Sequence, residues 1–166
     1  MSGARLIPGP VEAPPLRVPD WPLPGYRFVP GVNPHPVKHP EGHLHGAHTA
    51  DPPPEQVERY YLRGLDLFDQ HFWWECHEQL EAVWHTAERG SPYFDHVQGI
   101  IQLAAACLKH HVAEARAATR LLERARERLD RVVAAEGALA WGVDVPGLLA
   151  DTQRFLEGGD PPRIRG

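Results

Sequence analysis

The sequence has 166 residues, of which 42% are hydrophobic and 23% charged, as is typical of a globular protein with room for one ordinary domain. Its formal net charge of -5 argues against a nucleic-acid partner, because binding a phosphate backbone depends on clustered Lys and Arg. No apolar run near the N-terminus is long enough for a signal peptide or a membrane span, so we expect a cytoplasmic protein with no membrane partner. Cys76 and Cys107 have no zinc-ligand spacing, and a disulfide framework is not expected.

Residues 1–54 are predicted to form an irregular arm rich in proline and histidine. Most of the 18 prolines precede residue 55, and each removes a backbone N–H donor and fixes φ, which disfavours helices and central strands. The arm nevertheless carries four apolar anchors that a free tail would not need: Trp21, Tyr26, Phe28 and Val29. We therefore expect residues 20–46 to lie extended against the rest of the protein.

Hydrophobic periodicity predicts an all-α domain at residues 55–159, followed by a short tail at 160–166. About five helices are expected, at 54–70, 73–88, 93–111, 113–136 and 146–157. Short loops join them, so neighbours should pack as antiparallel hairpins in a compact bundle. The helix at 93–111 is apolar almost all round and should be the most buried. Gly64 costs about 1 kcal/mol relative to alanine in mid-helix, which indicates a close helix crossing there.

The helix expected at 73–88 carries polar residues within its predicted core-facing stripe. At about 100° per residue, His77 and Glu81 lie one turn apart on the side that Leu80 and other apolar residues share. A half-buried carboxylate costs on the order of a few kcal/mol unless hydrogen bonds, a cation or a metal hold it. Glu78 lies on the adjoining flank, so these polar groups are predicted to form the wall of a pocket.

The helix at 93–111 repeats this feature with Gln98 and Gln102, one turn apart. Their amides could satisfy His77 and Glu81, so we expect the two helices to face each other through these four polar side chains. Tyr61 and Trp84 are further candidates for the pocket wall, where they would face an aromatic or cationic ligand. The alternative for Trp84 is a core position, because aromatic residues at helical spacing usually pack in the core.

Two motifs within residues 61–108 carry a resemblance to a known family. The first is the pattern H-x-x-x-E-x-x-W, formed by His77, Glu81 and Trp84, and the second is QGIIQLAA at 98–105. Both resemble motifs of the bacterial and archaeal domain of unknown function family 309, a small all-helical domain. Residues 30–46 of the arm are similar to an extension found in longer members. The resemblance implies an all-helical fold and no particular activity.

A metal site is one hypothesis for the His/Glu pair. Spacing of i,i+4 places two ligands together, as in the zinc-protease motif, but this sequence reads H-E-x-x-E instead of H-E-x-x-H. Further ligands would come from elsewhere, and the sharpest form of the hypothesis takes His35 or His43 from the arm. The arm has five histidines, a density that suits zinc, copper or nickel: His35, His39, His43, His45 and His48. The alternative is structural: a His–Glu hydrogen bond that fixes helix packing, and arm histidines that serve as hydrogen-bond partners or face water.

Two classes of function therefore remain open, and whether the protein is an enzyme is not decided. In the first, the polar pocket binds a small molecule or a divalent transition metal such as zinc, with Glu78 or Glu81 as a base if the chemistry is hydrolytic. In the second, the domain is a helical protein–protein interaction module, and the His/Glu pair is structural. A homo-oligomer is compatible with both. A pocket open to solvent with unsatisfied polar atoms would favour the first class, and a sealed, satisfied cluster the second.

Overall fold

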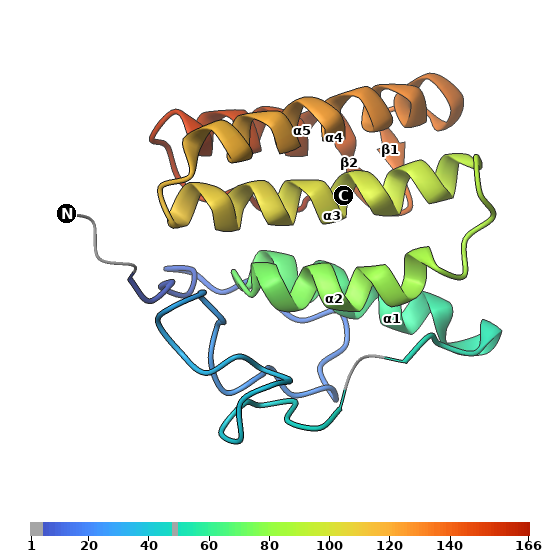
Figure 1. Cartoon of the computed structure of the whole chain (residues 1–166). Coiled ribbons are helices and arrows are strands. Elements are labelled where there is room, and N and C mark those ends of the chain that lie inside the picture. Colours follow the sequence, from blue (N-terminus) through green and yellow to red (C-terminus); the bar gives the residue numbers. More distant parts are fainter. Residues whose placement is uncertain (1–4, 48–49) are drawn as a thin grey trace.

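Five α-helices make up about half of the computed structural model, which describes residues 5–47 and 50–166 (Figure 1). A short 3-10 turn at Pro54–Gln56 precedes them. The helices are α1 (Val57–Asp69), α2 (Trp73–Trp84), α3 (Pro92–His111), α4 (Ala115–Glu136) and α5 (Val145–Leu156). A two-stranded antiparallel sheet, β1 (Leu139–Ala140) and β2 (Val143–Asp144), separates α4 from α5 in the chain. The predicted all-α fold is confirmed.

Helix α3 occupies the middle layer of the bundle. It lies between α1 and α2 on one side and α4 and α5 on the other (Figure 1), and it packs against α2, α4 and α5. The reason is its apolar surface, since residues such as Val97, Ile100 and Leu103 have no exposed area at all. Ser91 caps its N-terminus by accepting a hydrogen bond from the Phe94 N–H at 3.1 Å. The predicted central position of this helix is correct.

Two glycines allow neighbouring helices to approach closely. A Cβ atom added to Gly64 of α1 would lie 2.3 Å from Cδ2 of Leu80 on α2. A Cβ atom on Gly99 of α3 would lie 2.6 Å from Cδ2 of Leu129 on α4. Both distances are far below van der Waals contact, so the close crossing predicted at Gly64 is present, and a second one occurs at Gly99.

Helix α2 ends at Trp84, four residues before the predicted end at 88. Thr86 bonds back to the Val83 carbonyl oxygen with both its backbone N–H and its hydroxyl, at 3.0 and 2.7 Å, so the chain turns instead of continuing the helix. The hairpin of β1 and β2 was not predicted either. Its turn places Trp141 and Gly142 at φ 45° and 78°, as in a type I′ turn, and a tryptophan at such a position carries no turn signal.

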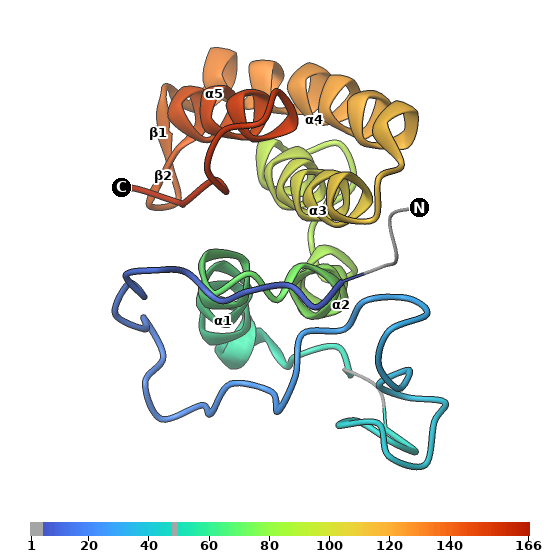
Figure 2. The same ribbon diagram turned by 90° about the vertical axis from the view of Figure 1, so that its left-hand side faces the viewer.

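The first part of the N-terminal arm crosses the end of the α1–α2 hairpin, and the rest lies on the side of α1 and α2 opposite α3 (Figure 2). Ile7, Val18, Phe28 and Val29 are the buried apolar residues of the arm. Residues 30–47 are not extended as predicted but form successive turns, closed by short-range hydrogen bonds such as Leu44 N–H to the Pro36 carbonyl oxygen at 2.8 Å. The predicted packing of the arm is therefore right, and its predicted extended conformation is wrong for this segment.

Buried acidic side chains of α1 anchor both the arm and the tail. Asp66 accepts hydrogen bonds from the backbone N–H groups of Arg17 and Val18, at 2.8 and 2.9 Å. Asp69 accepts one from Ile164 N–H at 2.7 Å and another from the Arg17 guanidinium at 2.9 Å. An irregular segment leaves its backbone donors without partners of its own, so the helix that it covers must supply the acceptors.

Across residues 5–47 and 50–166, no helix combines the length and apolar character that crossing a lipid bilayer requires.

Candidate functional site

His77, Glu78 and Glu81 form a compact polar cluster on α2. The His77 Nε2 atom lies 3.1 Å from Glu81 Oε1, and His77 Nδ1 lies 3.5 Å from Glu78 Oε1. One potential ligand atom from each of the three side chains lies within 4.8 Å of the other two. We call these three residues the α2 cluster. The predicted i,i+4 contact is present, and Glu78 joins it as a third polar group.

The α2 cluster is half-buried and open to solvent, with side-chain exposures of 32%, 29% and 39% for His77, Glu78 and Glu81. Burial acts to lower the pKa of His77, but the hydrogen bond to Glu78 and the charge of Glu81 outweigh it, so that the pKa lies above its ordinary value. The carboxylates thus favour the imidazolium form of His77. The site is accessible, as a binding site must be, but its imidazole is already paired.

The buried face of α2 is rotated by about one residue from the face that the sequence predicted. The fully buried stripe consists of Cys76, Leu80 and Val83, whereas His77 and Glu81 lie at its rim. On the other side of this stripe, Glu75 and Gln79 are buried, since the arm and α1 cover them. The polar residues most hidden from solvent on α2 are therefore not those that the periodicity indicated.

The two glutamines of α3 are not hydrogen-bonded to the α2 cluster in the part of the chain that the structure describes. Gln98 is half-buried, and Gln102 is buried with its Oε1 atom unpartnered among those residues. Helices α2 and α3 do pack against each other, but they do so through apolar side chains. The expected polar bridge between them is thus missing.

Tyr61 and Trp84 both make packing contacts. The Tyr61 hydroxyl donates to the Trp141 carbonyl oxygen at 3.0 Å and lies 2.8 Å from Nε2 of the buried His96. Burial and the neighbouring Tyr93 raise the pKa of Tyr61. Trp84 is half-buried against the core, with its ring 4.9 Å from that of Phe94. These contacts agree with the core position that was the alternative for Trp84.

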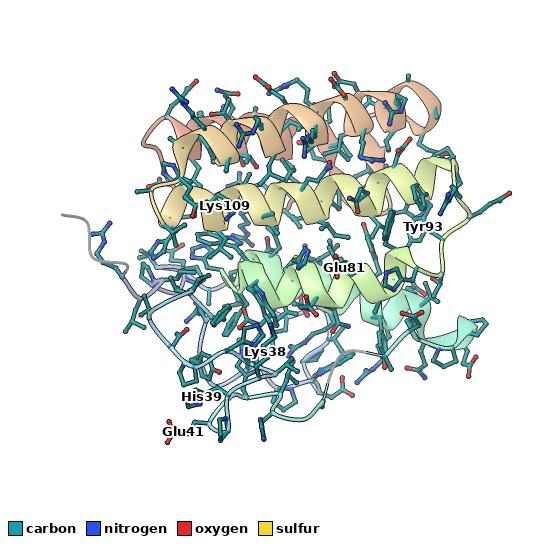
Figure 3. All side chains as sticks on the ribbon, in the orientation of Figure 1. Lys38, His39, Glu41, Glu81, Tyr93 and Lys109 are labelled. Atoms are coloured by element: carbon teal, nitrogen blue, oxygen red, sulfur yellow. The ribbon has the colours of Figure 1, made fainter. Side chains whose placement is uncertain are left out.

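None of the arm histidines that the structure describes joins the α2 cluster. Nδ1 of His35 accepts the backbone N–H groups of Val37 and Lys38, both at 3.2 Å, so it stabilises a turn within the arm. His39 and His45 are exposed, and Figure 3 shows His39 on an outer loop of the arm, well away from Glu81 on α2. His48 lies outside the described residues.

His43 is the arm histidine that reaches α2, but it contacts a residue that the sequence did not single out. Its Nε2 atom lies 2.9 Å from Oε2 of Glu75, and both side chains are at least 90% buried. The ring of Tyr26 packs over the His43 ring with a centroid distance of 4.6 Å. The hypothesis that His35 or His43 completes a site begun by His77 and Glu81 is therefore not borne out, since His43 pairs with Glu75 instead.

The His43–Glu75 pair forms part of the wall of a cleft of about 630 Å³ between the arm and helices α1 and α2. The arm contributes Trp21 and residues 22–25 and 43–44, α1 contributes Tyr60 and Arg63, and α2 contributes Glu75, Glu78 and Gln79. Glu78 therefore belongs both to the α2 cluster and to the wall of this cleft. A volume of this size is within the range of small-molecule sites.

Glu75, Arg63 and Gln79 were missed as site residues because their burial depends on the arm. A covering segment without regular structure leaves no periodic signal, so its position over α2 cannot be inferred from the pattern of apolar residues. One signal was available. In residues 63–79, charged and amide side chains occur on several faces of the two helices. A helical hairpin with polar side chains on several faces needs polar partners on more than one side.

Comparison with known families identifies one match. The family described as Domain of unknown function (DUF309) matches residues 61–121, which run from α1 to α4 and include the α2 cluster and Glu75. The family resemblance inferred from the two motifs is confirmed for this segment, and the arm lies outside it. No curated protein and no solved structure matches the chain.

Proposed function

We propose that His77, Glu78 and Glu81 bind one divalent transition metal ion, with zinc as the preferred ion, beside a cleft that holds a small molecule. The observation that carries this proposal is the convergence of one imidazole and two carboxylates within 4.8 Å on an accessible face of α2. Imidazole nitrogen and carboxylate oxygen are ligands that zinc accepts, and three protein ligands leave a coordination position for water or substrate.

The charges of the α2 cluster also suit a cation. Two carboxylates flank His77, and they already stabilise a positive charge there, as the raised pKa of the imidazole indicates. A metal ion would take the place of the imidazolium proton, because ligation requires a neutral imidazole. Glu78 connects the cluster to the cleft wall, so an open position on the ion would be close to a molecule in the cleft.

The test is a measurement of metal content on tag-free protein that is first freed of metal, then incubated with zinc and desalted. Inductively coupled plasma mass spectrometry should find about one zinc ion per chain in the wild type and much less in His77→Ala and Glu81→Gln. His45→Ala is the matched control, since it removes an exposed arm histidine and should leave the zinc content unchanged. Equal zinc content in His77→Ala and His45→Ala would contradict the proposal.

The alternative function is an interaction module in which the α2 cluster only fixes the helix surface. It is favoured by the fact that both nitrogens of His77 already face a carboxylate. Absence of zinc binding, together with a lower melting temperature for Glu81→Gln, would support this alternative.

A further inference from the structure

Three buried carboxylates face the arm, and in one of them a single oxygen accepts all the hydrogen bonds. Asp66 and Asp69 each accept hydrogen bonds at both oxygens. The donors to Asp66 include the backbone N–H groups of Arg17 and Val18, and the donors to Asp69 are the Arg17 guanidinium and the Ile164 N–H. Glu75 accepts bonds from Phe28 N–H at 3.0 Å and from His43 Nε2 at 2.9 Å, but both involve Oε2. Its Oε1 atom has no partner among the described residues.

An unpartnered carboxylate oxygen in such a position is costly. Glu75 is only 5% exposed, and a buried charged acceptor without a donor forfeits on the order of a few kcal/mol. If Glu75 served only to anchor the arm, both oxygens would be expected to accept donors, as in Asp66 and Asp69. Glu75 lies in the wall of the 630 Å³ cleft, and its Oε1 atom is shielded from solvent, so a ligand that enters the cleft and displaces the covering atoms is a source of the missing donor.

The remaining walls of the cleft narrow the chemistry of that ligand. Glu78 adds a second carboxylate, whereas the only guanidinium in the wall, that of Arg63, is already bound to the carbonyl oxygens of Trp21 and Pro22 at 2.8 and 2.5 Å. The aromatic rings of Trp21 and Tyr60 pack edge to face, 5.3 Å apart, within the same wall. The guanidinium groups of Arg59 and Arg63 already lie over the Trp21 ring, 5.4 and 5.2 Å from its centroid. The two carboxylates of the wall, rather than the ring faces, therefore favour an organic cation over an anion.

We infer that the cleft between the arm and α1–α2 binds a small organic ammonium or guanidinium ion, which donates an N–H to Glu75 Oε1 while its carbon skeleton lies against Trp21 and Tyr60. The inference does not depend on the proposed metal site, which uses His77, Glu78 and Glu81; Glu78 is the residue that the two sites share. The ligand class is a primary amine or an alkylguanidine, because both carry N–H donors on a cationic head.

Isothermal titration calorimetry with benzylamine and agmatine as probes tests this assignment on the full chain. At least one of the two should bind with a Kd below about 1 mM. Benzyl alcohol lacks the charge, and benzyltrimethylammonium has the charge but no N–H donor, so both should bind at least about tenfold more weakly than benzylamine. Equal binding of benzylamine and benzyltrimethylammonium, or no binding of either amine probe, would overturn the inference.

Variants locate the binding. Glu75→Gln should weaken amine binding by about tenfold or more, since it removes the charge. This substitution also affects the contacts of Phe28 and His43, so a second variant leaves Glu75 intact: Ala50→Trp adds bulk to the wall of the cleft and should also abolish binding. Ala47→Trp is its control, as an exposed arm residue outside the cleft wall, and His77→Ala should retain amine binding. Unchanged affinity in Ala50→Trp would place the amine elsewhere and refute the assignment.

Discussion

The buried imidazole of His96 should make the stability of the protein depend on pH between about 4 and 6.5. His96 has no exposed surface, and among the described residues its hydrogen-bonding partner is the Tyr61 hydroxyl, with no carboxylate beside it. Burial lowers the pKa of His96 to about 4, compared with 6.5 for a free histidine. The folded protein therefore keeps His96 neutral at pH values where the unfolded chain binds a proton.

The sign and size of the effect follow from this difference in pKa. The unfolded chain binds more protons than the folded one below pH 6.5, so the free energy of unfolding falls as the pH is lowered from about 6.5 towards 4. For one group with these two pKa values, the loss between pH 7.5 and pH 4.5 amounts to about 2.5 kcal/mol. This is a substantial part of the stability of an ordinary domain, which is about 5–15 kcal/mol.

The measurement is urea unfolding, followed by tryptophan fluorescence at several pH values between 4.5 and 7.5, on the wild type and on His96→Leu. Leucine has a similar volume and leaves the Tyr61 hydroxyl free to donate to the Trp141 carbonyl oxygen. Other titrating groups act on both proteins alike and cancel in the difference. The wild type should lose about 2.5 kcal/mol more than His96→Leu over this range. Parallel loss in both proteins would refute the reasoning.

Two further substitutions test the packing. Gly64→Ala should lower the free energy of unfolding by about 1–2 kcal/mol despite the better helix propensity of alanine, because its Cβ would overlap Leu80; thermal unfolding at equal or higher temperature would contradict the close crossing. Asp66→Asn should cost about 2–4 kcal/mol and speed tryptic cleavage of the arm, because an amide cannot accept all the N–H donors that surround it. In the control Asp20→Asn, which alters an exposed ion pair with Arg59, stability and cleavage rate should stay near those of the wild type.

The sequence predicted those features of the fold that depend on local pattern. The apolar residues of 93–111 placed α3 at the centre, and Gly64 marked the crossing of α1 and α2. The sequence did not predict the features that depend on long-range contacts. The hairpin at 139–144 has only two residues in each strand, too few for an alternating pattern to emerge. The turns of residues 30–47 depend on backbone hydrogen bonds that no side-chain pattern encodes.

The candidate site shows the same division. The contact of His77 with Glu81 follows from helix geometry alone, and it is present at 3.1 Å. The contact of His43 with Glu75 joins residues 32 positions apart, and it requires the arm to turn at residues 36–44 before reaching α2. Periodicity assigned α2 a single buried face because it assumes one core. In the structure α2 is covered on two sides, so Glu75 and Gln79 are buried beneath the arm while His77 and Glu81 remain half-exposed.

This second covering layer bears directly on function. The family match begins within α1, at residue 61, and does not include the arm, yet the arm supplies Trp21 and His43 to the wall of the cleft. The α2 cluster, in contrast, lies wholly within the matched segment. A protein with the matched segment but without such an arm would therefore keep the proposed metal ligands and lose the arm's part of the proposed ammonium site. Metal binding and amine binding should accordingly be separable, with the first a property of α2 and the second a property of the arm laid over it.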